Sequence, residues 1–312
     1  MSDELKNTAA EELLDEETVK DEGDIGFESL PVTSYWQDVV RMFLKNRIAV
    51  VGLVMFLVIV FMCCAAPLFT NYDPVSDIEY YNVKQPPGGA HLLGTDHIGR
   101  DVWARLLYGG RTSVLTGVLV ALFAAAIGVT IGLVSGYYGG TVDALLMRFT
   151  DIMLSFPFLI LAIAIMAALG SSQRNIIISL AVTSWPGFAR LTRSQVLAIK
   201  NSEYIEAAKV ADFANPRILF KHVLPNCMGT IIIQLTLTIG GAILSAAGLA
   251  YLGMSPNVAK PEWGAMLNDG KPYLRTHPYL TTIPGVAISI TVLAINWIGD
   301  GLRDAFDPKM RK

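Results

Sequence analysis

Six long stretches of the chain are apolar and carry no Asp, Glu, Lys or Arg. An α-helix needs about 20 mostly apolar residues to cross the hydrocarbon core of a bilayer. A charge near the middle of such a helix costs about 2.5–3.5 kcal/mol on insertion scales, so uncharged windows of this length are typical of membrane spans. The pattern predicts an all-α polytopic membrane protein with six transmembrane helices. The predicted spans lie within residues 48–69, 112–142, 152–173, 175–189 (running on toward 196), 223–259 and 278–299.

The composition agrees with a membrane protein. Of 312 residues, 53% are hydrophobic and only 16% are charged, whereas soluble chains average about 25% charged residues. The net charge of −3 conceals an uneven distribution, because residues 1–30 hold eleven acidic residues against two lysines. That segment has a net charge of −9 and leaves +6 on the rest of the chain. Its low apolar content predicts a disordered acidic tail over residues 1–35.

The distribution of Lys and Arg predicts the orientation. With the amino terminus inside, the inner segments hold 16 of the 24 basic residues and the outer segments hold eight. Basic residues favour cytoplasmic segments, so both termini and the polar stretch 203–226 are predicted to be cytoplasmic. The expected organisation is an acidic tail (1–35), an N-terminal segment with the first span (36–69), an extracytoplasmic loop (70–111), a core with five spans (112–302) and a cytoplasmic C-terminal tail (303–312).

Small residues follow a helical stripe in the second predicted span. Gly128, Gly132 and Gly136 are spaced by four residues, and Gly140 continues the series. This spacing places the glycines on one face, where a neighbouring helix can approach closely. The stripe indicates either ordinary helix packing or an interface that slides or faces a partner subunit. No predicted span has an ionisable residue near its centre, which weakens the hypothesis of an ion-coupled carrier.

The stretch 203–226 has the pattern of a helical hairpin. Asn201 and Ser202 can cap a first short helix, and Asn215 followed by Pro216 is typical of the start of a second one. Pro225 is expected to stop that second helix before the fifth span. Two short helices of this kind would form a compact projection that fits a groove in a soluble partner, although the periodicity alone is equally that of an ordinary connector.

The sequence EAAKVADFANPRILFKHVLPN favours the first interpretation. It resembles the EAA loop of bacterial ABC-importer permeases, here about residues 196–226, in which Glu-Ala-Ala is followed by a Gly and later by Leu-Pro. Asp212 stands in place of the usual Gly, and Asp adopts left-handed backbone geometry more readily than most residues. The resemblance implies that this loop couples the permease to an ATPase. The residues that carry or flank the match are Glu206, Ala207, Ala208, Asp212, Arg217, Leu224 and Pro225.

A second resemblance narrows the family. The stretch LLGTDHIGRDVWARLLYGGRTSV is similar to the outer motif of the C-type subunit of the dipeptide, oligopeptide and nickel permease family. Segments around EWGAML and GDGLRDAFDP also look like that group. The motif residues are expected either to brace the outer loop or to contact a receptor. They are Gly94, Thr95, Asp96, Gly99, Arg100 and Asp101.

The resemblance implies a transport subunit rather than an enzyme. No Gly-x-x-x-x-Gly-Lys-Ser/Thr phosphate loop occurs in the sequence, so ATP and Mg²⁺ are expected on partner subunits and no cofactor on this chain. The implied partners are a homologous permease in a heterodimer, two ATP-binding subunits, an extracytoplasmic substrate-binding protein and membrane lipid, with no nucleic acid. The expected location is the bacterial plasma membrane.

Several alternatives stay open at the level of sequence. The cargo could be peptides, nickel or another small solute, and a stand-alone carrier, a channel or a structural scaffold would also have six spans. His91 and His97 could suggest a metal site. They lie six residues apart in a loop without a typical ligand pattern, so no metal site is predicted.

Overall fold

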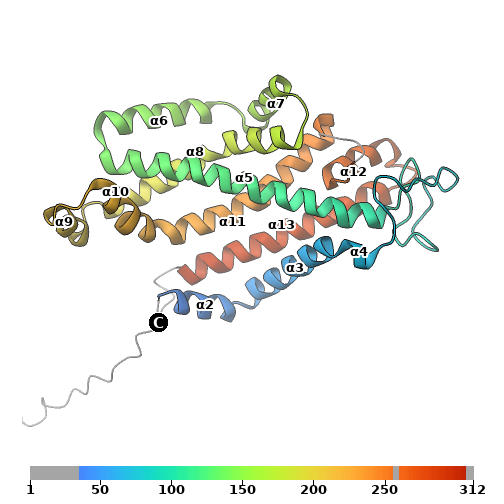
Figure 1. Ribbon diagram of the computed structural model, residues 1–312, viewed down its shortest axis with the longest axis horizontal. Coiled ribbons are helices and arrows are strands. Elements are labelled where there is room, and N and C mark those ends of the chain that lie inside the picture. The colour runs from blue at the N-terminus through green and yellow to red at the C-terminus, as the bar shows by residue number, and fades with distance from the viewer. Residues whose placement is uncertain (1–34, 256–259, 307–312) are drawn as a thin grey trace, which may run out of the picture. The chain divides into compact units, whose positions relative to one another are not determined.

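The computed structural model describes residues 35–255 and 260–306. It divides into a unit of Met1–Asp38 and a unit of Val39–Lys312. The predicted acidic tail lies almost entirely outside the described residues, as does the end of the predicted C-terminal tail. The helices of Figure 1 are α2 (Tyr35–Lys45), α3 (Arg47–Cys64), α4 (Ala66–Phe69), α5 (Val102–Tyr138), α6 (Gly140–Ser155), α7 (Phe158–Leu169), α8 (Gln173–Ile199), α9 (Glu203–Val210), α10 (Asn215–Ile218), α11 (Leu224–Leu249), α12 (Trp263–Gly270) and α13 (Tyr279–Phe306).

The predicted all-α membrane fold is confirmed, with differences in detail. Among the described residues, α3, α5, α13 and the helical run Asn215–Met254 are each long and apolar enough to cross a membrane. The third predicted span is a bent pair, α6 and α7, at 90° to each other. Pro157 causes the break, because a residue before proline avoids helical geometry and Phe156 is extended. The fourth span, α8, is 27 residues long, and its polar and basic residues keep it out of that apolar set.

Helix α5 begins ten residues earlier than the second span was expected to begin. Its 37 residues correspond to about 55 Å at 1.5 Å per residue, which exceeds the thickness of a bilayer core. Asp101 explains the early start, since its carboxylate accepts a hydrogen bond from the Ala104 N–H at 2.7 Å and caps the helix. The outer loop is correspondingly shorter than residues 70–111.

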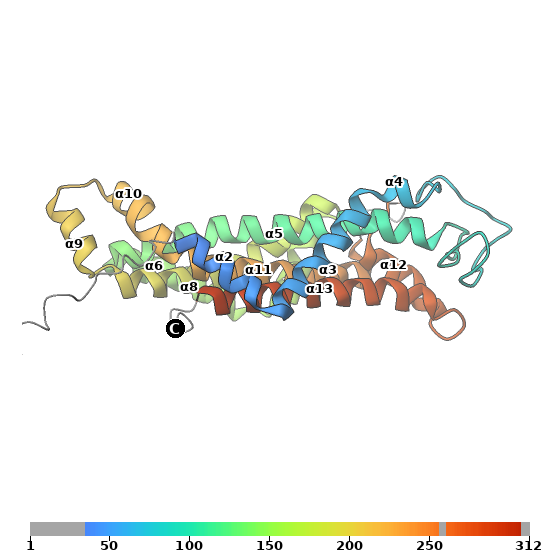
Figure 2. The same cartoon turned by 90° about the horizontal axis from the view of Figure 1, so that it is seen from below.

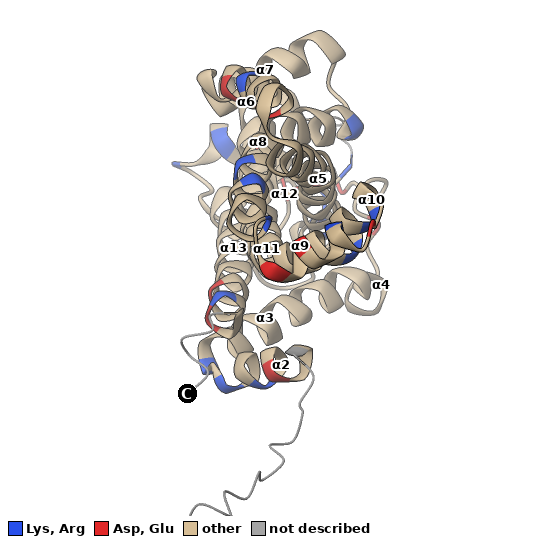
Figure 3. Ribbon diagram, turned by 90° about the vertical axis from the view of Figure 1, so that its left-hand side faces the viewer, with Lys and Arg blue, Asp and Glu red and all other residues tan. Residues whose placement is uncertain are grey.

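The helices run between two ends of the unit. One end carries α9, α10 and the last turns of α13, and the other carries α12 and the loop 70–101 (Figures 1 and 2). Figure 3 looks onto the α9–α10 end, where Lys and Arg positions occur on α2, α10 and the end of α13. The two segments that the sequence singled out therefore lie at opposite ends of one helical bundle.

Helices α5 and α8 pack closely against each other. A Cβ atom on Gly128 would lie 2.3 Å from the Trp185 carbonyl oxygen, and one on Gly132 would lie 2.5 Å from the Ala189 carbonyl oxygen. A Cβ atom on Gly136 would lie 2.8 Å from the Cβ atom of Val196. Gly128 and Gly132 therefore let the α5 backbone approach the α8 backbone closely, and Gly136 leaves room for the Val196 side chain.

Gly140 does not belong to that stripe. It follows Gly139, which has a φ of 68° and ends α5, and Gly140 is the first residue of α6. The chain changes direction at this turn, and α6 packs beside α8.

An ion pair joins α6 to α8 near the α9–α10 end. The Arg193 guanidinium donates two hydrogen bonds to the Asp143 carboxylate, both at 2.6 Å, and the Ser135 hydroxyl of α5 donates a third. Bidentate pairing of this kind fixes orientation as well as distance. These hydrogen bonds thus fasten α5, α6 and α8 together.

Replacing Gly132 with Ala is expected to destabilise the protein, because the new methyl group would collide with the α8 backbone. The cost should be about 1–3 kcal/mol, as for overpacking of a filled core. Gly187 is the matched control, since a Cβ there meets nothing within 4 Å. Thermal unfolding of the purified membrane protein should show a lower midpoint for Gly132→Ala and an equal or higher midpoint for Gly187→Ala. An unchanged midpoint for Gly132→Ala would contradict close α5–α8 packing.

Candidate functional site

The first candidate site is the projection formed by α9 and α10, residues 203–218, called the knob below. Helix α9 starts after Ser202, whose carbonyl oxygen accepts a hydrogen bond from the Glu206 N–H at 3.0 Å. Glu206 and Ala207 are exposed, and Val210 is 87% exposed. An apolar side chain of this size that is almost fully exposed at the tip of a projection favours contact with another protein.

The opposite face of α9 anchors the knob to the bundle. Ile205 and Ala208 are buried in one cluster with Ile218 of α10. The same cluster includes residues of α5, α8 and α11, namely Leu133, Val196, Cys227 and Ile231. The knob is therefore packed directly on several helices of the bundle.

Asp212 performs the turn that the family pattern assigns to glycine. Its φ is 54°, in the left-handed region. The Phe213 N–H donates to the Ala208 carbonyl at 3.2 Å, and the Asp212 N–H donates to the Lys209 carbonyl at 3.0 Å. This pair of hydrogen bonds is the Schellman arrangement that closes many helix ends. The tight turn is retained even though the residue is not glycine.

Arg217 packs inside the knob as well as adding charge to its surface. Its guanidinium lies 4.4 Å from the centre of the Phe213 ring, and His222 stacks on the same ring at 6.0 Å between centroids. Such a cation–π contact contributes about 0.5–1 kcal/mol at an exposed site. Arg217 therefore helps to hold the turn that follows α9.

Two expectations about α10 were wrong. Ala214, not Asn215, is the N-cap residue, because the Asn215 amide oxygen accepts a hydrogen bond from the Tyr137 hydroxyl at 2.9 Å. Pro225 also fails to stop the helix. A π-helical turn at Leu219–Val223 widens the backbone ahead of the proline, and the chain continues into α11. Leu224 is half-buried against the knob's cluster, and Pro225 is exposed.

The second candidate site is the outer motif, residues 94–101, at the opposite end. Arg100 is only 2% exposed. Its Nε donates to the Asp96 carboxylate at 2.6 Å, and Asp96 also accepts hydrogen bonds from the backbone N–H groups of Ile98 and Arg100. Such burial favours loop bracing over direct receptor contact for this pair.

Asp101 and the glycines complete the brace. The Asp101 carboxylate caps α5 with one oxygen and faces the His91 Nδ1 at 2.9 Å with the other. Gly94 and Gly99 have φ values of 79° and 93°, and a Cβ on either would lie 2.3 Å from a backbone oxygen of residues 79–85. Only glycine fits such positions.

Thr95 links the motif to the start of α13. It is fully buried, its hydroxyl donates to the Asn82 carbonyl, and that hydroxyl accepts from the Gln85 N–H at 2.8 Å. The Tyr279 hydroxyl donates to the carbonyl oxygens of Thr95 and Gln85, both at 2.9 Å. The loop is therefore tied to the last span as well as to α5.

Sequence reasoning missed three charged groups on α5 and in or beside α12, of which Arg105 and Glu262 are buried and Asp269 is half-buried. Arg105, 1% exposed, lies 3.6 Å from both Asp96 and Asp269, and Asp269 of α12 also lies 3.5 Å from Arg100. Burial raises the pKa of Asp269, opposed by the nearby guanidinium groups. Burial also raises the pKa of Glu262 to about 7, which favours its neutral form. The sequence did offer one indication of Glu262 and Asp269, because both lie in a Pro- and Gly-containing outer segment, each two residues from a lysine.

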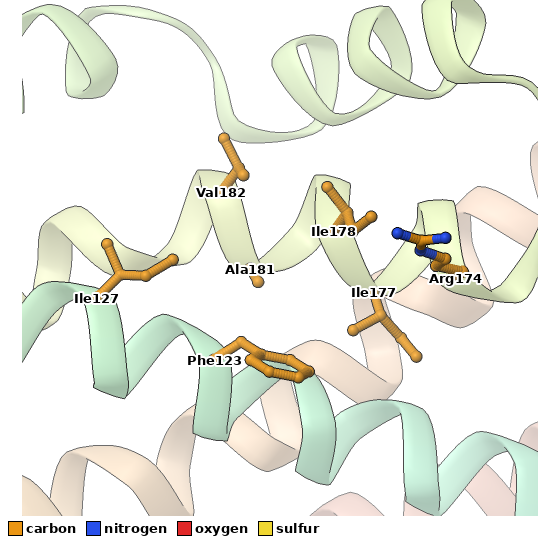
Figure 4. A pocket seen from close by; sticks show the side chains of 7 residues that line it. All are labelled: Phe123, Ile127, Arg174, Ile177, Ile178, Ala181 and Val182. Atoms are coloured by element: carbon orange, nitrogen blue, oxygen red, sulfur yellow. The ribbon is translucent and has the colours of Figure 1, made fainter.

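The described residues contain no group of three or more His, Cys, Asp or Glu side chains placed to hold a metal ion. A hollow of about 530 Å³ lies between α5 and α8. Figure 4 shows that Phe123, Ile127 and Ile177 line it and that Arg174 lies at one rim. Apart from Arg174, the residues that line the hollow are apolar.

Replacing Arg100 with Ala should lower the free energy of unfolding by about 3–5 kcal/mol, because the Asp96 and Asp269 carboxylates would lose a buried partner. Arg275 is exposed in the same outer region and serves as the control, where Ala should change stability by less than about 0.5 kcal/mol. Thermal unfolding and membrane expression measure both. Normal stability of Arg100→Ala with a loss of receptor-dependent uptake would instead indicate direct contact.

Replacing Asp212 with Gly should stabilise the knob by up to about 1 kcal/mol, because glycine adopts a φ of 54° without a side-chain penalty. Asp212→Val should destabilise it by at least as much. Ala214, with a φ of −57°, is the control at which Gly should bring no gain. Hydrogen exchange of residues 203–218 reports each effect, and equal exchange in all three variants would contradict the turn.

Comparison with known proteins agrees with this geometry. Residues 128–312 match the family model described as binding-protein-dependent transport system inner membrane component, and residues 34–87 match the N-terminal TM domain of oligopeptide transport permease C. The fold also resembles the inward-facing MetNI methionine ABC transporter, with a TM-score of 0.55 and 19% identity over 66% of this chain and 98% of that one.

Three relatives are similar over most of their length. The dipeptide transport system permease protein DppC of Alkalihalophilus pseudofirmus is 42% identical over 278 residues, which cover 89% of this chain and 91% of the relative. The oligopeptide permease OppC of Bacillus subtilis is 40% identical, with 89% and 91% covered. The glutathione permease GsiD of Pectobacterium atrosepticum is 38% identical, with 90% and 93% covered. All three are transport components rather than enzymes, and this chain belongs to the same family of binding-protein-dependent inner membrane permeases.

Proposed function

We propose that the chain is the C-type permease subunit of an ATP-driven importer of short peptides. The observation that carries this proposal is the similarity of about nine-tenths of the chain to permeases named for dipeptides, oligopeptides and glutathione. Glutathione is itself a short peptide, so one cargo chemistry covers all three names. Family membership also favours this function over a stand-alone carrier or channel.

The proposed assembly pairs this chain with a homologous permease, two ATP-binding subunits and an extracytoplasmic substrate-binding protein. ATP and Mg²⁺ would bind to the ATP-binding subunits, and lipid would surround the spans. In the proposed orientation the α9–α10 end and both termini face the cytoplasm of a bacterial cell, and α12 with the loop 70–101 faces outward. The predominance of Lys and Arg on the inner segments supports this orientation.

The knob would dock into a cleft of an ATP-binding subunit. Ala207 leaves a low surface between Glu206 and Val210, so a groove can receive the helix without a bulky obstacle. Because the buried face of α9 packs on α5, α8 and α11, closure of the ATP-binding subunits would pull on those spans together. That displacement would change which side of the membrane the peptide path faces.

The outer loop offers a separate surface for the substrate-binding protein. Tyr80 is 75% exposed and Tyr81 is fully exposed. Tyrosine is enriched in protein interfaces because it combines apolar area with a hydroxyl group. In this proposal the buried motif holds the loop in shape, and these tyrosines meet the receptor.

Replacing Glu206 with Lys tests the docking assignment. The variant reverses one charge on the exposed face of α9, and loss of a charge-assisted contact of about 1.5–3 kcal/mol corresponds to roughly 10- to 100-fold weaker association. Peptide uptake and co-purification of the ATP-binding subunits should both fall.

Glu203→Lys is the matched control, since Glu203 is also exposed in the first turn of α9 and the same charge is reversed at the same helix end. It should leave uptake and co-purification near wild type. Normal uptake with retained ATP-binding subunits in Glu206→Lys would show that the knob does not dock there.

A further inference from the structure

Helix α2 has three faces of different chemistry. Val39 and Phe43 are buried, and they pack in one cluster with Ala49 of α3 and Ala305 of α13. Val40 and Leu44 follow one position later along the chain and are 56% and 59% exposed. At 3.6 residues per turn, these two residues lie on one edge of the helix, next to the face that carries the exposed basic residues Arg41 and Lys45.

The position of α2 relative to the spans is fixed by Asn46. Its side-chain oxygen accepts hydrogen bonds from the N–H groups of Ile48 and Ala49 at 3.1 and 3.2 Å and so begins α3. Its side-chain nitrogen donates to Asp304 at 3.0 Å, near the end of α13. Two spans therefore end where α2 lies, as Figures 1 and 2 also show. Where α3 and α13 span the bilayer, α2 lies at the level of their ends.

Three basic residues at this boundary have no carboxylate partner within the described part of the chain. Arg41, Lys45 and Arg47 are all exposed, and none of the ion pairs of the described residues includes them. Long basic side chains beside exposed apolar residues are typical of helices that lie in the membrane interface.

We propose that α2 is an interfacial helix that binds anionic phospholipids. Val40 and Leu44 enter the acyl-chain region, and Arg41, Lys45 and Arg47 contact the phosphate groups of anionic lipids in the adjacent leaflet. Charge complementarity favours an anionic headgroup over a zwitterionic one, since Arg41, Lys45 and Arg47 place three exposed positive charges within a short stretch around Asn46, and none pairs with a carboxylate of the described residues. This surface is separate from peptide import and does not depend on that proposal.

The test uses the full chain in its assembled permease complex, reconstituted in nanodiscs with equal amounts of phosphatidylglycerol and phosphatidylcholine. Leu44→Trp adds an indole at an exposed position of α2. Subtracting the fluorescence of the parent complex from that of the variant complex gives the fluorescence of the added indole. Bromine is placed on the acyl chains of one lipid at a time. Brominated phosphatidylglycerol should quench the added indole at least about twofold more than brominated phosphatidylcholine, and added salt should reduce the difference.

A variant with Arg41→Gln, Lys45→Gln and Arg47→Gln on the same background should bring the quenching ratio to about one. Because these side chains are exposed, thermal unfolding of the complex should stay unchanged. The control carries Lys260→Gln, Lys271→Gln and Arg275→Gln at the opposite end of the bundle, with the same change in net charge, and should keep the preference.

A ratio of one in Leu44→Trp, a preference that survives the triple substitution, or no quenching by either lipid would overturn the proposal. The acidic segment 1–30 is the competing occupant of the basic face. If a preference for phosphatidylglycerol emerges only after the acidic residues of that segment are neutralised, the segment rather than lipid covers α2, and the proposal is likewise overturned.

Discussion

The close contact between α5 and α8 is the constraint on which the other features depend. Gly128, Gly132 and Gly136 bring the two backbones together, and the Asp143–Arg193 pair adds α6 to the same group. Lipid supplies no hydrophobic driving force between helices, so close packing and polar pairs between helices have to hold them. The three helices are therefore best regarded as one mechanical element.

Both candidate sites are built on the ends of that element. At one end, the knob shares a buried cluster with α5 and α8, and Tyr137 at the end of α5 donates to Asn215. At the other end, Asp101 caps α5 while Arg105 of the same helix pairs with the outer loop and α12. Helix α5 spans from one site to the other without a break. A displacement imposed on the knob would thus reach the outer loop through a continuous helix.

Composition and apolar pattern predicted the fold class and a helical hairpin at residues 203–226, whereas the resemblance to the permease family singled out the knob and the outer motif as functional segments. Asp212 adopts the left-handed geometry expected at its position in the resemblance, although its residue type differs. The errors came from tertiary interactions. The Asn215 side chain does not cap α10 because it accepts a hydrogen bond from Tyr137, which is distant in sequence. Pro225 does not end the helix because a π-helical turn precedes it, and no short-range sequence pattern indicates that turn. Asp269 could not be linked to Arg100, since 169 residues separate them and only the folded bundle brings them together.

The central claim is that the knob meets an ATP-binding subunit on the cytoplasmic side and that α5 and α8 carry its movement. Photo-crosslinking in intact cells tests this most directly, with a benzophenone amino acid at position 207 and a second at the exposed Tyr81. The account predicts that position 207 crosslinks to an ATP-binding subunit and that Tyr81 crosslinks to a substrate-binding protein. Crosslinks from position 207 to an extracytoplasmic protein, or to no subunit of the assembled importer, would contradict it.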